Sequence, residues 1–353
     1  MSWDKTFRLE ADDRLNIMPS RLCRFGIGHL DDALYGILPN DLVVIGADSG
    51  AGKSEIGLAI AQYNARAGKK VMLYFLEGGG IEAMARLKWR DIIRVYFDSY
   101  KFGVDLDYRK WRMNLYDEET AKILLDIEAR VYSEYKTKFK DNLNIYNVTN
   151  NFSIDDLLMS LLDLYDMEKS ICDRTLKGGF GLDLIVIDHL QYFDLTIGEN
   201  EIQATTKILK EVKKITDIYR IPVVLISHLR KKGKDRGLPD QEDFYGSSNI
   251  PKIASLAITI APDKENYNLA NGIYPTFFRI CKSRTGITSN FAIKCDFELR
   301  TRTYKKQYQL YRINNFGAVS EEALNYLELP SWAKEGNCKE GLTAAEREEQ
   351  RYK

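Results

Sequence analysis

Short, continuous apolar runs alternate along the chain with longer stretches in which apolar residues recur every three or four positions. Runs of the first kind are typical of strands that are buried on both faces of a parallel sheet, and stretches of the second kind are typical of helices that pack on such a sheet. We therefore expect strands at 42–46, 70–76, 143–146, 184–188, 221–227, 256–260 and 276–280, and helices at 30–34, 55–67, 81–96, 117–139, 154–168 and 200–219.

Two segments nearer the C-terminus, 291–297 and 307–313, alternate apolar with polar residues instead. This alternation is typical of antiparallel strands with one solvated face. The pattern as a whole predicts an α/β fold, a mostly parallel twisted sheet flanked by helices, with antiparallel strands at its C-terminal edge. The expected organisation is an N-terminal arm at 1–24, one domain at 25–333 with a largely helical segment at 81–180, and a polar tail at 334–353.

The first strand runs into a loop of small residues, and an apolar helix pattern follows that loop. The loop reads A-x-x-x-x-G-K-S, a Walker A motif that opens with Ala47 where glycine is commoner. Its backbone N–H groups can converge on phosphate oxygens, and the following helix adds the positive end of its dipole. Lys53 can reach the terminal phosphates, and the Ser54 hydroxyl can hold Mg²⁺. The sequence therefore predicts a nucleoside triphosphate site at Ala47, Asp48, Ser49, Gly50, Ala51, Gly52, Lys53 and Ser54.

Two acidic residues follow buried strands whose carboxyl ends face the same ligand crevice as this loop. Asp188 ends the apolar run at 184–187, which makes that run a Walker B strand. Its carboxylate is expected beside Ser54, where it holds the Mg²⁺ shell through water. Glu77 follows the run at 70–76 and precedes three glycines, so it is placed to orient or deprotonate an attacking water. The alternative for Glu77 is a plain solvated residue at a strand end.

His228 ends the apolar run at 221–227 and is expected at the same edge. It either senses the γ-phosphate or is an ordinary hydrogen-bonded residue. The segment after it is the clearest local concentration of positive charge. As a rule such a segment is a solvated loop, but beside a nucleotide site it favours contact with a nucleic-acid backbone. The basic residues are Arg230, Lys231, Lys232, Lys234 and Arg236.

Composition limits the function classes. The 353 residues include 51 Lys+Arg and 51 Asp+Glu, so nucleic-acid binding must depend on local patches. Five cysteines and three histidines show no metal-binding spacing, which argues against a zinc site, and the odd cysteine count suits a reducing compartment. Apolar runs of membrane-spanning length and a signal-peptide core are both missing from the sequence. We expect a soluble, cytoplasmic protein with no membrane partner.

Five segments, in this order, resemble the RecA-type ATPase domain of hexameric replicative helicases, the DnaB family and its phage helicase-primase and Twinkle-like branch. They are FGIGHLDDALYGILPNDLVVIGADSGAGKS, VMLYFLE, GLDLIVIDHLQ, IPVVLISHLRKKGK and RICKSRTG, and the resemblance covers about residues 24–315. It implies a RecA-like P-loop NTPase that hydrolyses ATP with Mg²⁺. It also implies a hexameric ring that translocates on single-stranded DNA in the replication of a phage, plasmid or mobile element.

The resemblance assigns roles by motif position. It implies that Glu77 is the catalytic base, Asp188 the Walker B acid and His228 the phosphate sensor. Arg284, together with Lys282, matches the finger segment that reaches the γ-phosphate held by the neighbouring subunit. The nucleotide site would then be shared between subunits of a homo-oligomer.

Further expectations follow from the same resemblance. Gln191, in the Walker B segment, is assigned to the nucleotide site. Loops around 231–250 would face the central channel and hold single-stranded DNA by its phosphates. A primase, a loader or a polymerase is a further candidate partner.

Three departures from the family leave a second hypothesis open. Only about twenty residues precede the motor, where these helicases usually carry a primase or primase-docking domain, the loop at 194–201 is acidic, and the segment YGSSNIPKIAS matches the family's glycine-serine loop only loosely. The alternative is a RecA-like ATPase switch that controls assembly with a protein partner and unwinds nothing. A catalytically silent scaffold is disfavoured, because it has no need of the set Lys53, Ser54, Glu77, Asp188 and Arg284.

Overall fold

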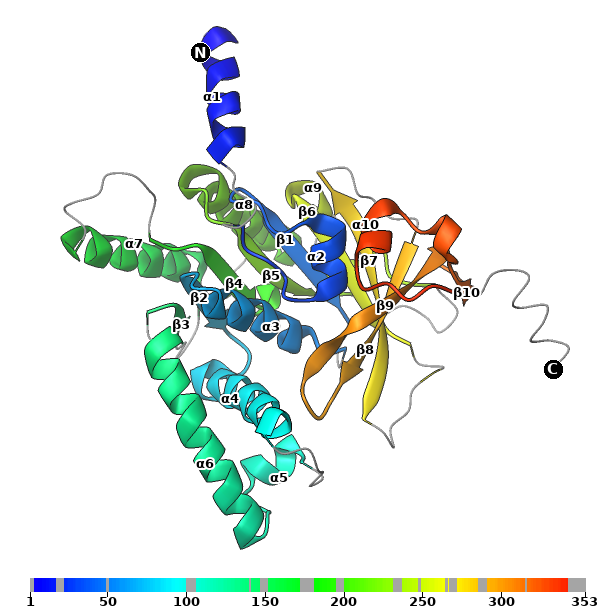
Figure 1. The fold of residues 1–353 in the computed structure, drawn as a ribbon. Coiled ribbons are helices and arrows are strands. Elements are labelled where there is room, and N and C mark those ends of the chain that lie inside the picture. Colours follow the sequence, from blue (N-terminus) through cyan, green and yellow to red (C-terminus); the bar gives the residue numbers. More distant parts are fainter. Residues whose placement is uncertain are drawn as a thin grey trace, which may run out of the picture.

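Ten strands in the described part of the chain form one sheet, in the order β10-β9-β8-β7-β6-β1-β5-β4-β2-β3 (Figure 1). Neighbouring strands are parallel from β6 through β1 to β3 and antiparallel from β6 to β10. This confirms the predicted fold class. The computed structural model describes residues 3–16, 22–48, 51–99, 106–139, 141–146, 152–171, 181–194, 200–230, 237–246, 249–263, 266, 272–284, 291–314 and 316–341.

The strands lie close to their predicted positions. The parallel strands are β1 (Leu42–Ala47), β2 (Val71–Phe75), β3 (Leu143–Tyr146), β4 (Leu184–Asp188), β5 (Val223–His228) and β6 (Leu256–Pro262). The antiparallel strands are β7 (Ile273–Ser283), β8 (Phe291–Glu298), β9 (Thr303–Ile313) and β10 (Val319–Ala323). Of these, β10 has no counterpart in the sequence prediction, because its residues at 320–322 are polar and it forms an exposed edge.

The described helices include the six expected ones, near their predicted positions, and four that were not expected, at 3–16, 108–112, 250–253 and 331–335. They are α1 (Trp3–Asn16), α2 (Gly28–Leu34), α3 (Lys53–Arg66), α4 (Gly79–Ser99), α5 (Tyr108–Arg112), α6 (Glu118–Glu134), α7 (Ile154–Ile171), α8 (Glu201–Tyr219), α9 (Ile250–Ile253) and α10 (Ser331–Glu335). Short turns of other helix types occur at η2 (Tyr135–Phe139), η3 (Leu190–Tyr192), η4 (Gln241–Asp243) and η6 (Tyr326–Glu328).

Helices cover both faces of the parallel strands, which is why those strands read as continuous apolar runs. Successive side chains of a strand point to opposite faces, so Val43 and Ile45 of β1 join one core, whereas Leu42 and Val44 join the other. The first core is closed by residues of α2, α3 and α10, and the second by residues of α7, α8 and α9. The sheet is therefore held from both sides.

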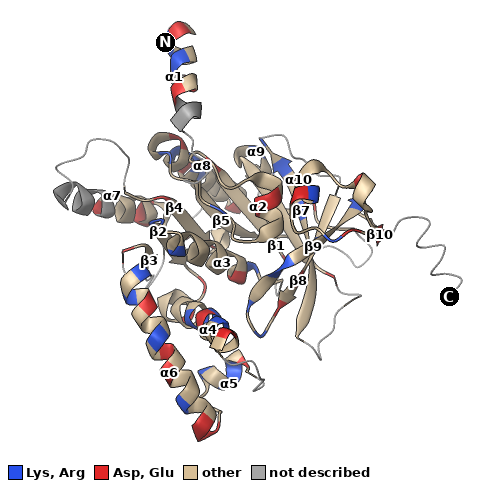
Figure 2. Cartoon of the chain, viewed as in Figure 1, with Lys and Arg blue, Asp and Glu red and all other residues tan. Residues whose placement is uncertain are grey.

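The helical segment has a core of its own. Trp89 and Ile92 of α4 pack with Leu124 and Ile127 of α6 in a third apolar cluster. Asp117 is the N-cap of α6. Its side chain accepts a hydrogen bond from the Thr120 backbone N–H at 2.8 Å and satisfies a donor that the helix start leaves unpaired. Figure 2 shows charges of both signs interspersed along α6. This part forms a small helical unit beside the parallel end of the sheet (Figure 1).

Contacts with the body extend beyond residues 25 and 333, the expected ends of the domain. Helix α1 stands away from the sheet in Figure 1, with Trp3 and Phe7 exposed, but Cys23 is buried and pairs with Ile37, so the body begins before residue 25. At the other end α10 spans the expected boundary at 333/334 and packs on α2. The backbone N–H groups of Lys339 and Gly341 still donate to β9 and to Leu324, each at 2.7 Å. Within the described residues, contacts with the body therefore continue to Gly341.

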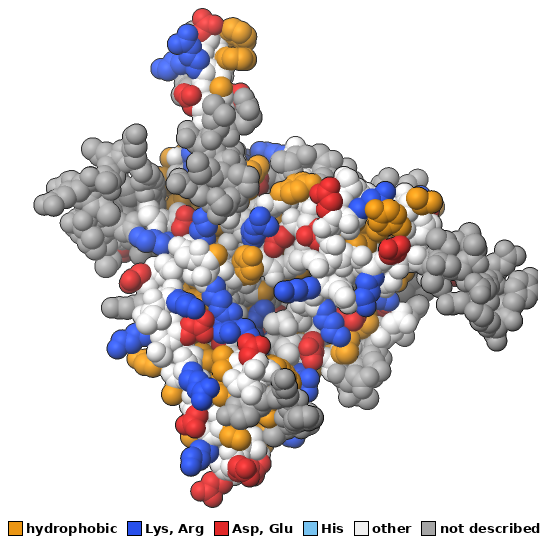
Figure 3. Space-filling model, viewed as in Figure 1, with side chains coloured by type: hydrophobic (Ala, Val, Ile, Leu, Met, Phe, Trp, Pro, Cys, Tyr) orange, Lys and Arg blue, Asp and Glu red, His pale blue; other side chains and the backbone are white. Residues whose placement is uncertain are grey.

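The surface carries mixed charge. On the face shown in Figure 3, basic and acidic side chains are interspersed, as equal numbers of each sign would suggest. Among the helices that are described, none is both long and apolar enough to cross a membrane.

Candidate nucleotide site

The predicted phosphate loop joins β1 to α3. Ala47 is the last residue of β1, where it pairs with His228 of β5 and Ile260 of β6, and Lys53 is the first residue of α3. Gly52 caps the helix with φ at 76°, a left-handed conformation that glycine adopts without strain. The Ala51 backbone N–H donates to the Asp48 carbonyl at 3.1 Å, so the loop turns tightly. Ser49 and Gly50 lie outside the described residues.

Lys53 contacts two of the other predicted site residues, His228 and Glu77. Its ammonium lies 2.6 Å from Nε2 and 3.2 Å from Nδ1 of His228, and 3.7 Å from a carboxylate oxygen of Glu77. Only 7% of Lys53 is exposed, so its charge is carried inside the crevice. The three predicted residues therefore converge, although they come from α3, from the turn after β2 and from the end of β5.

Glu77 sits in a tight turn. A Cβ atom at Gly78 would lie 2.5 Å from the Phe75 ring, which explains the need for glycine directly after the glutamate. The Glu77 side chain remains 44% exposed and lines the same cavity as Lys53. A carboxylate in this position can reach both a bound ligand and water.

His189 joins the cluster of Lys53, Glu77 and His228, and the sequence analysis did not single it out. Its Nε2 lies 3.4 Å from Glu77 and 3.2 Å from Nε2 of His228. Burial, together with the nearby charge of Lys53, lowers the pKa of His189 to about 3 and also lowers the pKa of His228. Both rings are therefore neutral at pH 7, and the contact of His189 with Glu77 is not an ion pair. The available signal was its position directly after the Walker B acid.

Gln191 contacts both histidines and Ser227 through its side-chain amide. Its side-chain oxygen accepts a hydrogen bond from the His228 backbone N–H at 3.1 Å, and its amide nitrogen donates to the Ser227 hydroxyl at 3.0 Å. The same oxygen lies 3.2 Å from Nδ1 of His189, so that nitrogen carries the ring hydrogen. Gln191 thus contacts both histidines and is not among the residues that line the cavity, and its assignment to the nucleotide site stays a prediction.

Asp188 presents the features of a cation ligand. It is fully buried at the end of β4, and neither carboxylate oxygen has a hydrogen-bond partner among the described residues. Burial raises its pKa to about 6, although the Ser54 hydroxyl and Lys53 both act to lower it. Ser54 and Lys53 offset only part of the cost of burying this carboxylate, and a divalent cation held between Asp188 and Ser54 would offset more of it. The residues present therefore fit Mg²⁺.

A cavity of about 640 Å³ adjoins these groups, within the range of small-ligand sites. One wall is polar and includes Gly52, Lys53, Ser54, Glu77 and His228. Another part of the lining comes from the end of β6, from β7 and β8 and from the turn after β8, and it is largely apolar. Its members are Pro262, Tyr274, Thr276, Phe297 and Leu299. The cavity can therefore take a ligand with one anionic end and one flat, apolar end.

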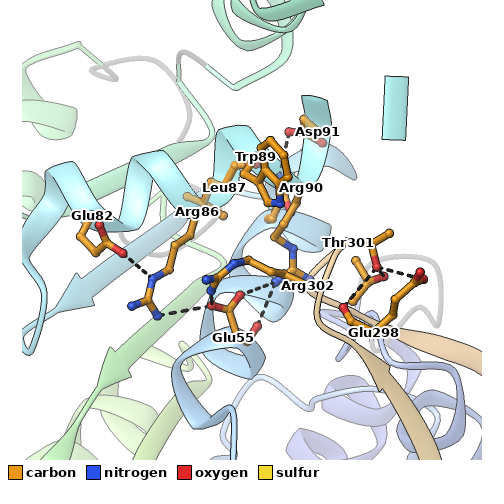
Figure 4. A network of polar contacts seen from close by, with 12 residues as sticks. Glu55, Glu82, Arg86, Leu87, Trp89, Arg90, Asp91, Glu298, Thr301 and Arg302 are labelled. Atoms are coloured by element: carbon orange, nitrogen blue, oxygen red, sulfur yellow. Dashed lines mark hydrogen bonds and ion pairs between the residues drawn. The ribbon is translucent and has the colours of Figure 1, made fainter. Parts of the chain in front are cut away.

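Glu55, the residue after Ser54, lines this cavity and forms ion pairs with three arginines (Figure 4). Arg86 and Arg90 come from α4, with guanidinium nitrogens 3.3 Å and 3.7 Å from its carboxylate. Arg302 comes from the turn between β8 and β9 and pairs with the same carboxylate. Sequence reasoning could not find this network, because no motif connects three segments so distant in the chain.

The two finger candidates lie elsewhere. Ser283 pairs with Leu256 at the start of β6. Lys282 and Arg284 therefore lie at the amino-terminal ends of the parallel strands, whereas the phosphate loop lies at their carboxyl ends. The Lys282 ammonium donates to three backbone carbonyls, of Pro251, Lys252 and Ala254, at 2.6–3.1 Å. Arg284 is exposed and lines a separate cavity of about 240 Å³. The structure does not bring either residue to Lys53 of the same chain.

The basic segment is described only at its start. The Arg230 backbone N–H donates to the Asp243 carbonyl at 2.7 Å. Lys231, Lys232, Lys234 and Arg236 lie outside the described residues. Their expected contact with nucleic acid stays a prediction.

Comparison with known proteins identifies the family of this chain. The family model described as the DnaB-like helicase C-terminal domain matches residues 23–306. A curated replicative DNA helicase DnaB of Haemophilus influenzae is 28% identical over 247 residues, which are 69% of this chain and 46% of that protein. The DnaB of Buchnera aphidicola is 25% identical over 244 residues, 68% of this chain and 46% of that protein. The chain thus aligns with less than half the length of these relatives.

Solved structures support the fold. A structure that consists of an ATPase domain has a TM-score of 0.64 at 17% identity, covering 86% of this chain and 98% of that one. A structure of a DnaB-like replicative helicase, from work on its interactions with primase, gives the same TM-score and identity over 86% of this chain and 66% of that one. Since the family match spans most of its length, this chain belongs to the DnaB-like helicase C-terminal domain family.

Proposed function

We propose that this chain is the ATP-hydrolysing motor of a ring-forming DNA helicase that translocates on single-stranded DNA. One observation carries the proposal. Lys53, Ser54 and Glu77 line a single cavity at the start of α3, and Asp188 is buried next to Ser54, whereas Arg284 lies at the opposite end of the parallel strands. A motor whose arginine finger acts on the next subunit requires that the finger and the nucleotide cavity of one chain lie far apart.

The cavity suits a nucleotide in one orientation. Backbone N–H groups at the start of α3 and the Lys53 ammonium would bind the phosphates, and the apolar wall around Tyr274 and Phe297 would receive the base. Bound Mg²⁺, held by Ser54 and Asp188, would neutralise charge on the phosphate oxygens. Lys53 would then exchange its contact with His228 for one with phosphate.

Hydrolysis requires a base and an orienting shell. Glu77 would accept a proton from the attacking water, and its carboxylate is exposed enough to meet that water. The neutral His189 contacts both Glu77 and His228. Movement of His228 towards a phosphate would therefore change the position of His189 and, through it, of the Glu77 carboxylate. Arg284 of a neighbouring subunit would complete charge stabilisation, as an arginine finger does.

DNA stimulation decides between this function and its alternative. ATP turnover is measured with and without single-stranded DNA, and strand separation is measured on a forked duplex, with Lys53→Ala as the inactive control. A DNA-stimulated rate together with unwinding supports the helicase. Turnover that ignores DNA, with no unwinding, would instead indicate an ATPase switch acting on a protein partner. A wild-type chain without turnover would reject both.

A further inference from the structure

The turn between β8 and β9 crosses the rim of the nucleotide cavity and docks on the helical segment. The Trp89 indole N–H of α4 donates to the Arg300 backbone carbonyl at 2.9 Å, and the Arg300 guanidinium lies 4.8 Å from the centre of the Phe97 ring. Leu299 and Arg302 of the same turn line the cavity. The turn is therefore fixed at a defined place beside the ligand space.

Arg302 is held in one orientation. Its guanidinium pairs with Glu55 and stacks over the Tyr108 ring with 4.0 Å between the guanidinium carbon and the ring centre. The side chain is only 15% exposed, and its Nε has no hydrogen-bond partner among the described residues. Since a guanidinium carries five N–H donors, this side chain keeps donors that Glu55 does not use.

Positive charge exceeds negative charge at this rim. Glu55 is the shared carboxylate for Arg86, Arg90 and Arg302, and of these only Arg86 has a second described ion pair, with Glu82 at 2.8 Å. Arg86 and Arg302 both line the cavity, and Arg90 is buried behind them. An anionic ligand in the cavity would supply the charge that this cluster lacks.

We propose that Arg302 is a nucleotide-contact residue that acts within its own subunit. Its guanidinium binds the phosphate chain of the nucleotide, and Glu55 is the positioning residue that holds it at the rim. This rests on the proposed nucleotide function. It adds to the phosphate loop a cation from the antiparallel half of the sheet, about 250 residues further along the chain by the numbering of Lys53 and Arg302.

Binding measurements on Arg302→Ala test the proposal, with Arg300→Ala as the matched control. Arg300 lies on the same turn but contacts Phe97 and Glu298 instead of the cavity. Affinities for ATP, ADP, adenosine and inorganic tripolyphosphate are measured by competition with a fluorescent nucleotide in buffer containing Mg²⁺. Loss of one charge-assisted contact should weaken ATP, ADP and tripolyphosphate binding by roughly tenfold to a hundredfold in Arg302→Ala and leave adenosine unchanged. Arg300→Ala should bind all four as wild type does.

Each other outcome is decisive. Wild-type ATP affinity in Arg302→Ala, with loss in Lys53→Ala, would overturn the role of Arg302 and leave the proposed function standing. An equal loss for adenosine would show that Arg302 shapes the cavity rather than binding phosphate, which also overturns it. If Arg302→Ala does not fold, as judged by circular dichroism, Arg302→Lys replaces it and should retain part of the phosphate affinity. Failure of the wild-type chain to bind ATP would reject the proposed function itself.

Discussion

Lys53 and Arg284 lie beyond opposite ends of the parallel strands. Lys53 follows the end of β1, where Ala47 pairs with Ile260, whereas Arg284 follows Ser283, which pairs with Leu256 level with Val43. Four residues of extended strand, about 13 Å, separate the two levels before the loop adds more. An arginine at that end cannot serve the cavity of its own chain, which supports a site completed by a second subunit.

Mixing two inactive variants tests the shared site. Arg284→Ala keeps an intact phosphate loop, and Lys53→Ala keeps an intact finger. A mixture should therefore regain part of the wild-type ATPase rate, because some interfaces combine the two good halves. Hydrolysis is measured across mixing ratios at constant total protein.

The control for that experiment pairs Lys53→Ala with Glu77→Gln. Both changes damage the same half of the site, so this mixture should stay inactive at every ratio. Absence of rescue in the Arg284→Ala mixture as well would remove Arg284 from the site.

Glu77→Gln should separate binding from chemistry. Glutamine keeps the size of the side chain but cannot take a proton, so ATP affinity should stay near wild type while turnover falls by about 10²- to 10⁴-fold. Single-turnover hydrolysis and equilibrium nucleotide binding are measured on the same preparation. Glu82→Gln, which pairs with Arg86 on α4, is the matched control and should retain turnover. Undiminished turnover in Glu77→Gln would mean that another group is the base.

Glu55→Gln should destabilise the nucleotide-free protein strongly. The substitution leaves three arginines without their shared buried carboxylate, and breaking a buried ion pair costs about 3–5 kcal/mol. Denaturant unfolding gives the free energy. Glu128→Gln provides the comparison, since its pair with Lys88 is about one third exposed and should contribute less than about 1 kcal/mol. Equal losses in the two variants would contradict a special role for Glu55.

His29 should make the protein sensitive to acid. It is fully buried against Phe278 and Tyr308, neither ring nitrogen has a partner among the described residues, and burial lowers its pKa to about 3 from the usual 6.5. The unfolded chain therefore binds the proton first, so the stability linked to His29 is complete above pH 6.5 and is lost as the pH falls towards 3. At pH 5 the loss is about 2 kcal/mol.

The variant His29→Leu isolates this effect. Unfolding free energies of wild type and variant are compared from pH 8 to pH 5. The difference between them should shift in favour of the variant by about 2 kcal/mol at the acid end, because other titrating groups are common to both. Parallel curves would show that His29 is not the group responsible.

Local sequence motifs were sufficient where one segment defines the chemistry. Glu77 and Asp188 each lie at the end of an apolar run, Lys53 follows the loop after such a run, and parallel strands bring their carboxyl ends together. The contacts of His189 with His228, of Arg302 with Glu55 and of Lys282 with backbone carbonyls join segments that are distant in the chain. The hydrophobic periodicity of the sequence does not predict such contacts. The contacts around the expected tail boundary are of the same kind, since Trp332 and Ala333 belong to the core cluster that includes residues of α2 and of the sheet.

The packing of the C-terminal residues also bears on how this protein can be divided. The family match ends at residue 306, yet Tyr308, Leu310 and Trp332 belong to the same core as the strand that carries the phosphate loop. A fragment cut at 306 would remove Tyr308, Leu310 and Trp332 from that core, leave β8 without most of its partner β9, and lose the hydrogen bond from the Tyr308 hydroxyl to Asp32. We expect such a fragment to bind apolar dyes and to aggregate, whereas a fragment ending at 341 should unfold cooperatively. The boundary of the shared motor and the boundary of the folding unit are therefore different places in this chain.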